Sequence, residues 1–163
     1  TDFLTNRTGF VVLHPSAASG LAVTVTHADG TVEEGQFPVA IDPVQPMKNL
    51  RMLTHEAVPG LTVSCRMEGD VYEMEDQRNW TDASYKTYVR PLALPWPYTL
   101  ARGEGLEQAV YLAVHSQGAA QPSPSAMAQT LMKASDPPSG IRSHFTPGAT
   151  SMASPLSGPR ANG

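Results

Sequence analysis

The chain has 163 residues, a formal net charge of −4 and only 16% charged side chains. This size fits one small domain, and the charge excludes the clustered cations that bind nucleic-acid phosphates. A single cysteine excludes a disulfide-stapled mini-protein. No apolar run approaches the roughly 18 residues that span a bilayer, and no basic segment precedes an apolar one near the start, so we expect no signal peptide and a cytoplasmic location.

Short apolar runs with turn signals between them recur through the first 115 residues, which is the pattern of β-strands. Asp29-Gly30, between two such runs, favours a tight hairpin. We expect strands, in chain order, at 9–14, 21–27, 31–37, 49–56, 61–68, 71–75, 85–89, 98–101 and 106–115. Strands spaced by about 8–12 residues predict an all-β, antiparallel β-sandwich-like domain over 1–115. The sequence begins with Thr1-Asp2-Phe3-Leu4 and not with Met, which is typical of the interior of a domain, so we expect this domain to be incomplete at its N-terminus.

The segment 61–68 gives the clearest alternation of apolar and polar residues. It predicts a strand with one buried face, on which Cys65 is a structural thiol. His14, next to Pro15, is expected to be a strand-end residue rather than a metal ligand.

Residues 116–163 differ in kind, because most of them are Pro, Gly, Ser or Ala. Such a segment buries too little apolar surface to offset the entropy of ordering, so we expect a disordered, low-complexity tail. A slip of reading frame near residue 115 explains the abrupt change equally well, and both interpretations stay open. A proline-rich ligand is disfavoured, since no PxxP motif with a basic flank is present.

The densest group of polar and charged residues lies between Glu68 and Tyr88. On a strand, Glu73 and Glu75 share one face, and a carboxylate pair of this kind binds sugar hydroxyls, holds a cation or acts as general acid and base. The alternative is a solvated strand face, followed by a loop whose Arg78 and Lys86 pair with nearby acids. Spacing alone favours this alternative.

Other chemistries lack their usual signatures. The five histidines show no HxH or HxxxH spacing, so we expect no metal site. The chain also lacks a Gly-x-Ser-x-Gly elbow and a glycine-rich phosphate loop, so we expect neither a serine-hydrolase triad nor a bound cofactor.

The stretch from Glu73 to Tyr88, followed by Pro91-Leu-Ala-Leu-Pro95, resembles the N-terminal domain of the bacterial D-apionate lactonase family. The segments 6–15 and 37–46 are similar to earlier motifs of that family, in the same order, so the resemblance covers about residues 3–114. It implies a β-sandwich-like domain that precedes and supports a (β/α) barrel. It further implies an enzyme that hydrolyses the small sugar lactone D-apionolactone to D-apionate. We expect the barrel to be missing from this chain, and no catalytic residue of the family is carried over.

Lactone hydrolysis needs an activated water and donors for the developing oxyanion. By residue type, Glu73 or Glu75 is the candidate base, and Arg78, Asn79 or Lys86 is the candidate oxyanion partner. Alternatively, the loop that begins at Asp76 binds substrate or packs against the barrel; its candidate residues are Asp76, Asn79, Trp80 and Asp82. We prefer the packing role and expect the isolated chain to be inactive or nearly so.

Two other classes of function stay open. One is a non-catalytic carbohydrate-binding β-sandwich that uses Trp80 and Trp96 as sugar platforms. The other is a structural or assembly module without a ligand. Neither nucleic acid nor a membrane is an expected partner.

Overall fold

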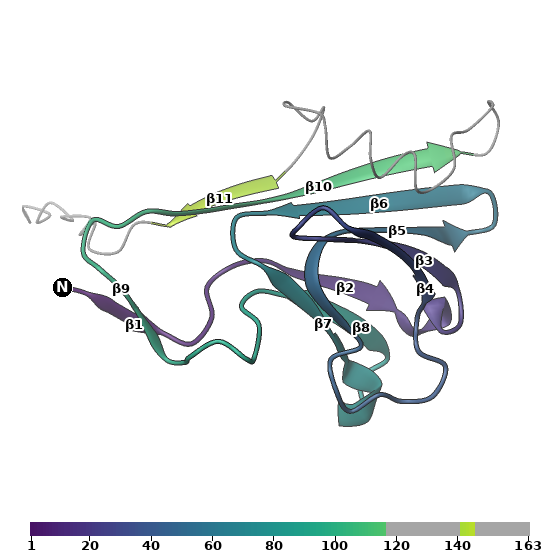
Figure 1. Ribbon diagram of the computed structural model, residues 1–163, viewed down its shortest axis with the longest axis horizontal. Coiled ribbons are helices and arrows are strands. Elements are labelled where there is room, and N and C mark those ends of the chain that lie inside the picture. Colours follow the sequence, from purple (N-terminus) through teal and green to yellow (C-terminus); the bar gives the residue numbers. More distant parts are fainter. Residues whose placement is uncertain (117–140, 146–163) are drawn as a thin grey trace, which may run out of the picture.

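The computed structural model describes residues 1–116 together with the backbone of residues 141–145. In chain order the elements are β1 (Phe3–Thr5), β2 (Val11–Pro15), the 3-10 turn η1 (Ser16–Ala18), β3 (Ala22–His27), β4 (Val32–Gln36), β5 (Met47–Val58), β6 (Leu61–Glu68), β7 (Tyr72–Asp76), the 3-10 turn η2 (Gln77–Trp80), β8 (Ser84–Tyr88), β9 (Tyr98–Leu100), β10 (Leu106–Ser116) and β11 (Ile141–Phe145) (Figure 1). No helix in this part of the chain is long and apolar enough to cross a membrane.

The all-β antiparallel class is confirmed, and every expected strand is present as one of β2 to β10. Their bounds differ from the expected ones by no more than two residues at either end. Two strands were not predicted. β1 has only three residues, and β11 lies inside the range for which we expected a disordered tail, where it pairs antiparallel with β10. The rest of that range, 117–140 and 146–163, lies outside the described residues.

The long strand β5 organises the main sheet because it pairs with three other strands. Residues 52–55 have register partners in both β3 and β6, so these two strands lie on opposite edges of β5. Leu50 has partners in β3 and β7, which places β7 on the same edge as β6, further along the strand. The sheet therefore branches at β5: one branch continues through β6 to β10 and β11, and the other through β7 to β8 and β2 (Figure 1).

The buried apolar side chains of the two branches and of the β3–β4 hairpin form one core. Its fully buried members include Val23 of β3, Leu53 of β5, Met67 of β6 and Met74 of β7, each at most 1% exposed. Cys65 is buried as expected, and this burial raises the pKa of its thiol to about 12, which keeps it protonated and unreactive at neutral pH.

The alternation in β6 is confirmed for the core face, but the expectation that only one face is buried is wrong. Ser64 and Arg66, on the other face, are as buried as the apolar residues. The hydroxyl of Ser64 lies 2.8 Å from that of Thr54, and Arg66 pairs with Glu68 at 3.0 Å. Ser64 thus bonds across to β5, whereas Arg66 pairs with a residue of its own strand and lies 4.6 Å from the ring centre of Tyr111. The buried Nη2 atom of Arg66 has no hydrogen-bond partner among the described residues, so only the burial of Ser64 is fully compensated.

Two histidines lie within the core. His14 is 5% exposed, its Nε2 atom lies 2.9 Å from Thr87 Oγ1, and its ring packs against Phe37 and His55. Burial, with a further contribution from His55, lowers the pKa of His14 to about 4. His14 does lie at the end of β2, next to Pro15, as expected, and its ring is in addition a neutral part of the core.

The segment that enters β2 is fixed by one buried amide. The Oε1 atom of Gln108, a residue of β10, accepts a hydrogen bond from Phe10 N at 3.2 Å, and its Nε2 atom donates to Thr8 O at 3.0 Å. Between them, Gly9 has a φ of +152°, and a Cβ there would lie 2.0 Å from Gln108 Oε1. This close approach explains the glycine in the first of the segments that resemble the lactonase family.

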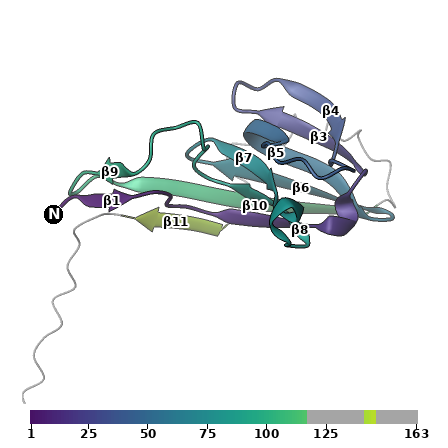
Figure 2. The ribbon, with the colours of Figure 1, turned by 90° about the horizontal axis from the view of Figure 1, so that it is seen from below.

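β1 and β9 form a separate two-stranded sheet beside the main one. Figure 2 shows this ribbon at one end of the molecule, away from the β3–β4 hairpin. The ribbon matters below because a cavity opens where its two strands separate.

Candidate functional site

The two candidate bases share one face of β7, opposite Tyr72 and Met74 of the core, as predicted. Their register partners on β8 are Tyr88 for Glu73 and Lys86 for Glu75. The two carboxylates nevertheless have different surroundings, so each needs its own description.

Glu73 is a buried acceptor. It is 3% exposed, and its Oε1 atom accepts hydrogen bonds from the Tyr88 hydroxyl at 2.5 Å and from Leu92 N at 2.7 Å. Burial raises the pKa of the Tyr88 hydroxyl, and its bond to Glu73 raises it further. Glu73 thereby fixes the chain as it leaves β8 for the proline-rich segment 91–97.

Glu75 forms an ion pair with Lys86, which is itself a candidate oxyanion partner. Its Oε2 atom lies 2.6 Å from Lys86 Nζ, and both side chains are 21% exposed. This cross-strand ion pair joins two of the catalytic candidates to each other, as the alternative based on spacing anticipated.

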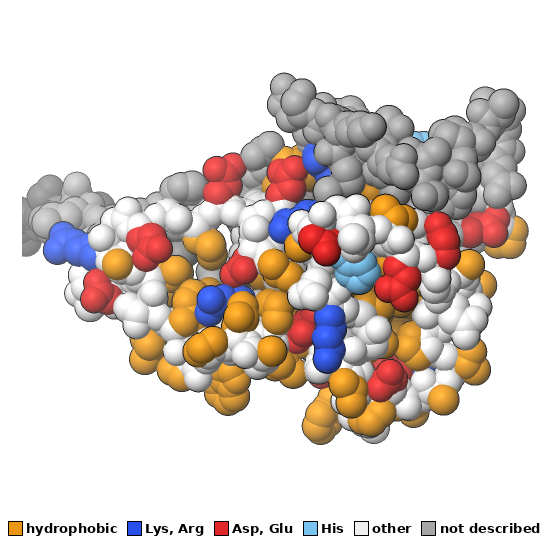
Figure 3. Space-filling model, viewed as in Figure 1, with side chains coloured by type: hydrophobic (Ala, Val, Ile, Leu, Met, Phe, Trp, Pro, Cys, Tyr) orange, Lys and Arg blue, Asp and Glu red, His pale blue; other side chains and the backbone are white. Residues whose placement is uncertain are grey.

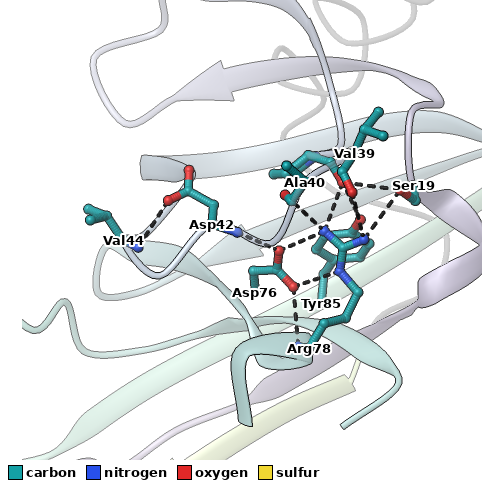
Figure 4. A network of polar contacts seen from close by, with 9 residues as sticks. Ser19, Val39, Ala40, Asp42, Val44, Asp76, Arg78 and Tyr85 are labelled. Carbon is teal, nitrogen blue, oxygen red and sulfur yellow. Dashed lines mark hydrogen bonds and ion pairs between the residues drawn. The ribbon is translucent and has the colours of Figure 1, made fainter. Parts of the chain in front are cut away.

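Asp76 and Arg78 form the best-bonded group in this region (Figure 4). The Asp76 carboxylate is fully buried and accepts hydrogen bonds from Arg78 Nε at 2.8 Å, Arg78 Nη2 at 2.7 Å, Arg78 N at 3.2 Å and Asp42 N at 3.0 Å. The hydrogen bonds from the Arg78 side chain are the largest cause that lowers the pKa of Asp76, so the carboxylate stays ionised.

The remaining donors of Arg78 hold the loop that follows β4. Nη1 donates to the Ser19 hydroxyl and to Val39 O, both at 3.3 Å. Nη2 also donates to the carbonyls of Pro38 and Ala40, at 2.9 and 3.3 Å. The guanidinium lies 4.7 Å from the ring centre of Tyr85, and Figure 4 shows it between this ring and the loop. Every nitrogen of the guanidinium therefore already donates within the domain.

The exposed tip of this region has a different character. Asn79, Trp80 and Asp82 are exposed, and Trp80 is 67% exposed. The loop held by Arg78 adds Val39, Ile41 and Val44, each more than half exposed. We call Val39, Ile41, Val44 and Trp80 the apolar platform. In Figure 3 hydrophobic side chains gather along the lower edge of the molecule, where η2 lies in Figure 1. The loop candidates thus divide into buried Asp76 and three exposed residues.

One cavity was not predicted from the sequence. It has a volume of about 390 Å³ and is lined by Thr5, Asn6, Arg7 and Trp96. Trp96 had been considered as a sugar platform, but no spacing pattern connects it to residues almost ninety positions earlier. In the described part of the chain, no group of three or more His, Cys, Asp or Glu side chains is placed to hold a metal ion.

Comparison with known proteins decides the family. Residues 1–117 match the family described as "D-apionate lactonase, N-terminal domain". The chain belongs to this family. D-apionate lactonase of Brucella anthropi is 58% identical over 113 residues, which are 69% of this chain and 19% of that protein. The chain therefore spans about a fifth of the length of this curated relative. No solved structure matches. The resemblance seen in the sequence is confirmed.

Proposed function

We propose that this chain is the N-terminal β domain of a cytoplasmic hydrolase that opens D-apionolactone to D-apionate, and that it supports the catalytic domain instead of carrying the reaction. The family and the 58% identity to a D-apionate lactonase support the reaction. The supporting role depends on one observation: Glu73, Glu75, Arg78 and Lys86, which are all the catalytic candidates except exposed Asn79, are already engaged within the domain.

Ester hydrolysis needs a base with an available lone pair and N–H donors aimed at a developing oxyanion. Glu73 is buried and accepts two hydrogen bonds, and Glu75 and Lys86 neutralise each other. Arg78 donates from every side-chain nitrogen to Asp76, Ser19 or a backbone carbonyl. These contacts favour structural roles over catalytic ones.

The apolar platform is the surface that we propose for packing against the catalytic domain. Four large apolar side chains are presented by two loops, and Arg78 ties these loops together through Val39 O and Ala40 O. A pre-organised patch with an exposed tryptophan is typical of an interface centre, because little entropy is lost on docking. Asn79 and Asp82 then lie at the polar rim.

A domain exchange tests this proposal. The matching segment of the Brucella anthropi enzyme is replaced by residues 1–117 of this chain, and hydrolysis of D-apionolactone is measured for the chimera and for the 163-residue chain. We expect the chimera to hydrolyse the lactone and the chain alone to give no acceleration. Glu75→Gln in the chimera should leave turnover unchanged, whereas Trp80→Ala should lower the yield of folded, active chimera.

Two results would count against the proposal. Lactone hydrolysis by the chain alone would show that it carries the reaction. A folded chimera without activity, checked by a cooperative melt, would show that this domain does not serve the same role as that of the relative.

A further inference from the structure

The cavity lined by Thr5, Asn6, Arg7 and Trp96, which we call the ribbon mouth, opens where the β1–β9 ribbon ends. The last register pair of the ribbon is Thr5 with Tyr98. The next residue on the β9 side is Pro97, which has no N–H to extend the ladder. The segments that continue β1 and precede β9 therefore separate here, with Arg7 on one side and Trp96 on the other.

Arg7 brings an exposed guanidinium to one side of the mouth. Its guanidinium lies 4.9 Å from the ring centre of Tyr88, whose hydroxyl is fixed by Glu73. Within the described residues, no carboxylate or carbonyl accepts a hydrogen bond from this guanidinium. Arg90 makes the contrast clear, because it also stacks on a tyrosine, Tyr98, but pairs with an aspartate at 3.2 Å.

Trp96 brings an exposed aromatic face to the opposite side. Its side chain is 64% exposed, and it stands between Pro95 and Pro97, which restrict the backbone on both sides. The Pro95 carbonyl accepts a hydrogen bond from Arg90 Nη1 at 3.5 Å, which helps to hold this segment. An exposed indole on a restrained loop presents a large apolar surface with little entropy left to lose.

The remaining wall of the mouth is polar. The Thr5 hydroxyl donates to Arg7 O at 3.3 Å, so it shapes the turn between β1 and Arg7. Asn6 lies between them and adds an exposed amide that can both donate and accept. A cation, an amide and an aromatic face thus surround one cavity of about 390 Å³, within the range of about 300–1,000 Å³ typical of small-molecule sites.

We propose that the ribbon mouth binds a polyhydroxy monocarboxylate, that is, a sugar acid. Arg7 pairs with the carboxylate, for which its planar fork of N–H groups is well suited. Trp96 packs against the C–H face of the carbon chain, and the Asn6 amide bonds a hydroxyl group. A neutral lactone lacks the carboxylate, so the mouth selects the open acid over the lactone. This binding goes beyond the supporting role proposed above and does not depend on it.

Tryptophan fluorescence of the 163-residue chain provides the test, with sodium D-gluconate as the probe. The chain has two tryptophans, so a Trp80→Phe background leaves Trp96 as the reporter. We expect a saturable change in emission with a Kd in about the millimolar range. Sorbitol, which has the same number of carbons but no carboxylate, and sodium chloride at equal ionic strength should give no saturable change.

Variants separate the site from a general charge effect. Arg7→Gln should weaken gluconate binding at least about tenfold, as expected when a charged hydrogen-bond pair is lost, while the variant still melts cooperatively. Arg102→Gln removes an exposed cation beyond the other end of the ribbon and should leave binding unchanged.

Three results would overturn the proposal: no saturable response to gluconate, an equal response to sorbitol, or unaltered binding by Arg7→Gln. An equal response to sorbitol would indicate a platform for neutral carbohydrates instead. Because the chimera assay measures lactone turnover and uses no gluconate, failure here and failure of the supporting role are distinguishable.

Discussion

Arg78 and Arg7 both lie over a tyrosine of β8, at 4.7 Å from the ring centre of Tyr85 and 4.9 Å from that of Tyr88. Their other contacts differ. Arg78 donates to a buried carboxylate, a hydroxyl and three carbonyls, whereas Arg7 has only the ring among the described residues. Stacking on an aromatic ring therefore does not distinguish the roles of the two arginines. The hydrogen bonds that the five N–H groups of each guanidinium make do distinguish them. The first arginine builds the fold, and the second is available to a ligand.

The largest effect expected from this comparison is on stability. Arg78→Ala leaves the Asp76 carboxylate, which is 2% exposed, without its charged partner. It also removes the donor to the carbonyls of Val39 and Ala40, whereas Pro38 O still accepts from the Tyr85 hydroxyl. We expect the free energy of unfolding to fall by about 3–5 kcal/mol, as when one member of a buried ion pair is removed. Arg7→Ala should change it by at most about 1 kcal/mol. Urea denaturation of both variants checks this, and equal losses would remove the distinction.

The second largest effect expected is a loss of stability at acidic pH. Burial lowers the pKa of His14 to about 4 from 6.5, so the unfolded chain binds a proton more readily than the folded one. The stabilisation by neutral His14 is complete above pH 6.5 and is lost as the pH falls towards 4, by on the order of 3 kcal/mol. The pKa of His55 is lowered in the same direction, mainly by burial.

This acid effect can be separated from the region around Arg78. The pKa of Asp76 lies below 3.8 in the folded chain, so its contribution is lost only at still lower pH. Unfolding free energies at pH 7, 5.5 and 4.5 should therefore fall for the unaltered chain and fall much less for His14→Gln. A variant that keeps the full slope would show that His14 is not the group responsible.

The smallest expected effect compares the two glutamates. Glu73→Gln keeps an acceptor for Tyr88 and Leu92 but removes its charge, which should cost about 1–2 kcal/mol for a buried site. Glu75→Gln breaks an ion pair that is partly exposed, and we expect a change of at most about 0.5 kcal/mol. The same urea titrations measure both, and a larger loss for Glu75→Gln would reverse our assignment of the buried and solvated roles.

Much of the fold was accessible from the sequence because its signals are local. The alternation in 61–68 and the turn at Asp29-Gly30 each depend on a few consecutive residues. The structure contains the strand and the hairpin that they predict, β6 and β3–β4. The pairing of the strands was not accessible. That β5 pairs with three strands follows from contacts between distant residues, and β1, with three residues, carries too little pattern to be recognised.

The candidate site divides in the same way. Period-two geometry placed Glu73 and Glu75 on one face of a strand, which is correct. Nothing in that spacing shows that Leu92 N reaches Glu73, or that Arg78 reaches carbonyls about forty residues earlier in the chain. The ribbon mouth is the extreme case, because Arg7 and Trp96 meet only through the pairing of β1 with β9.

The shared strand β5 also governs how the domain opens. β6 pairs with residues 52–58 of β5 and β7 pairs with Met47 and Leu50, so both branches depend on the same strand. Amide protons of these strands are therefore expected to exchange with solvent together, in a single cooperative event. Among the described residues, β1 and β9 pair only with each other, in a separate sheet. We expect their amide protons to exchange earlier, through local fraying. The ribbon mouth thus lies at the part of the described domain that we expect to open first.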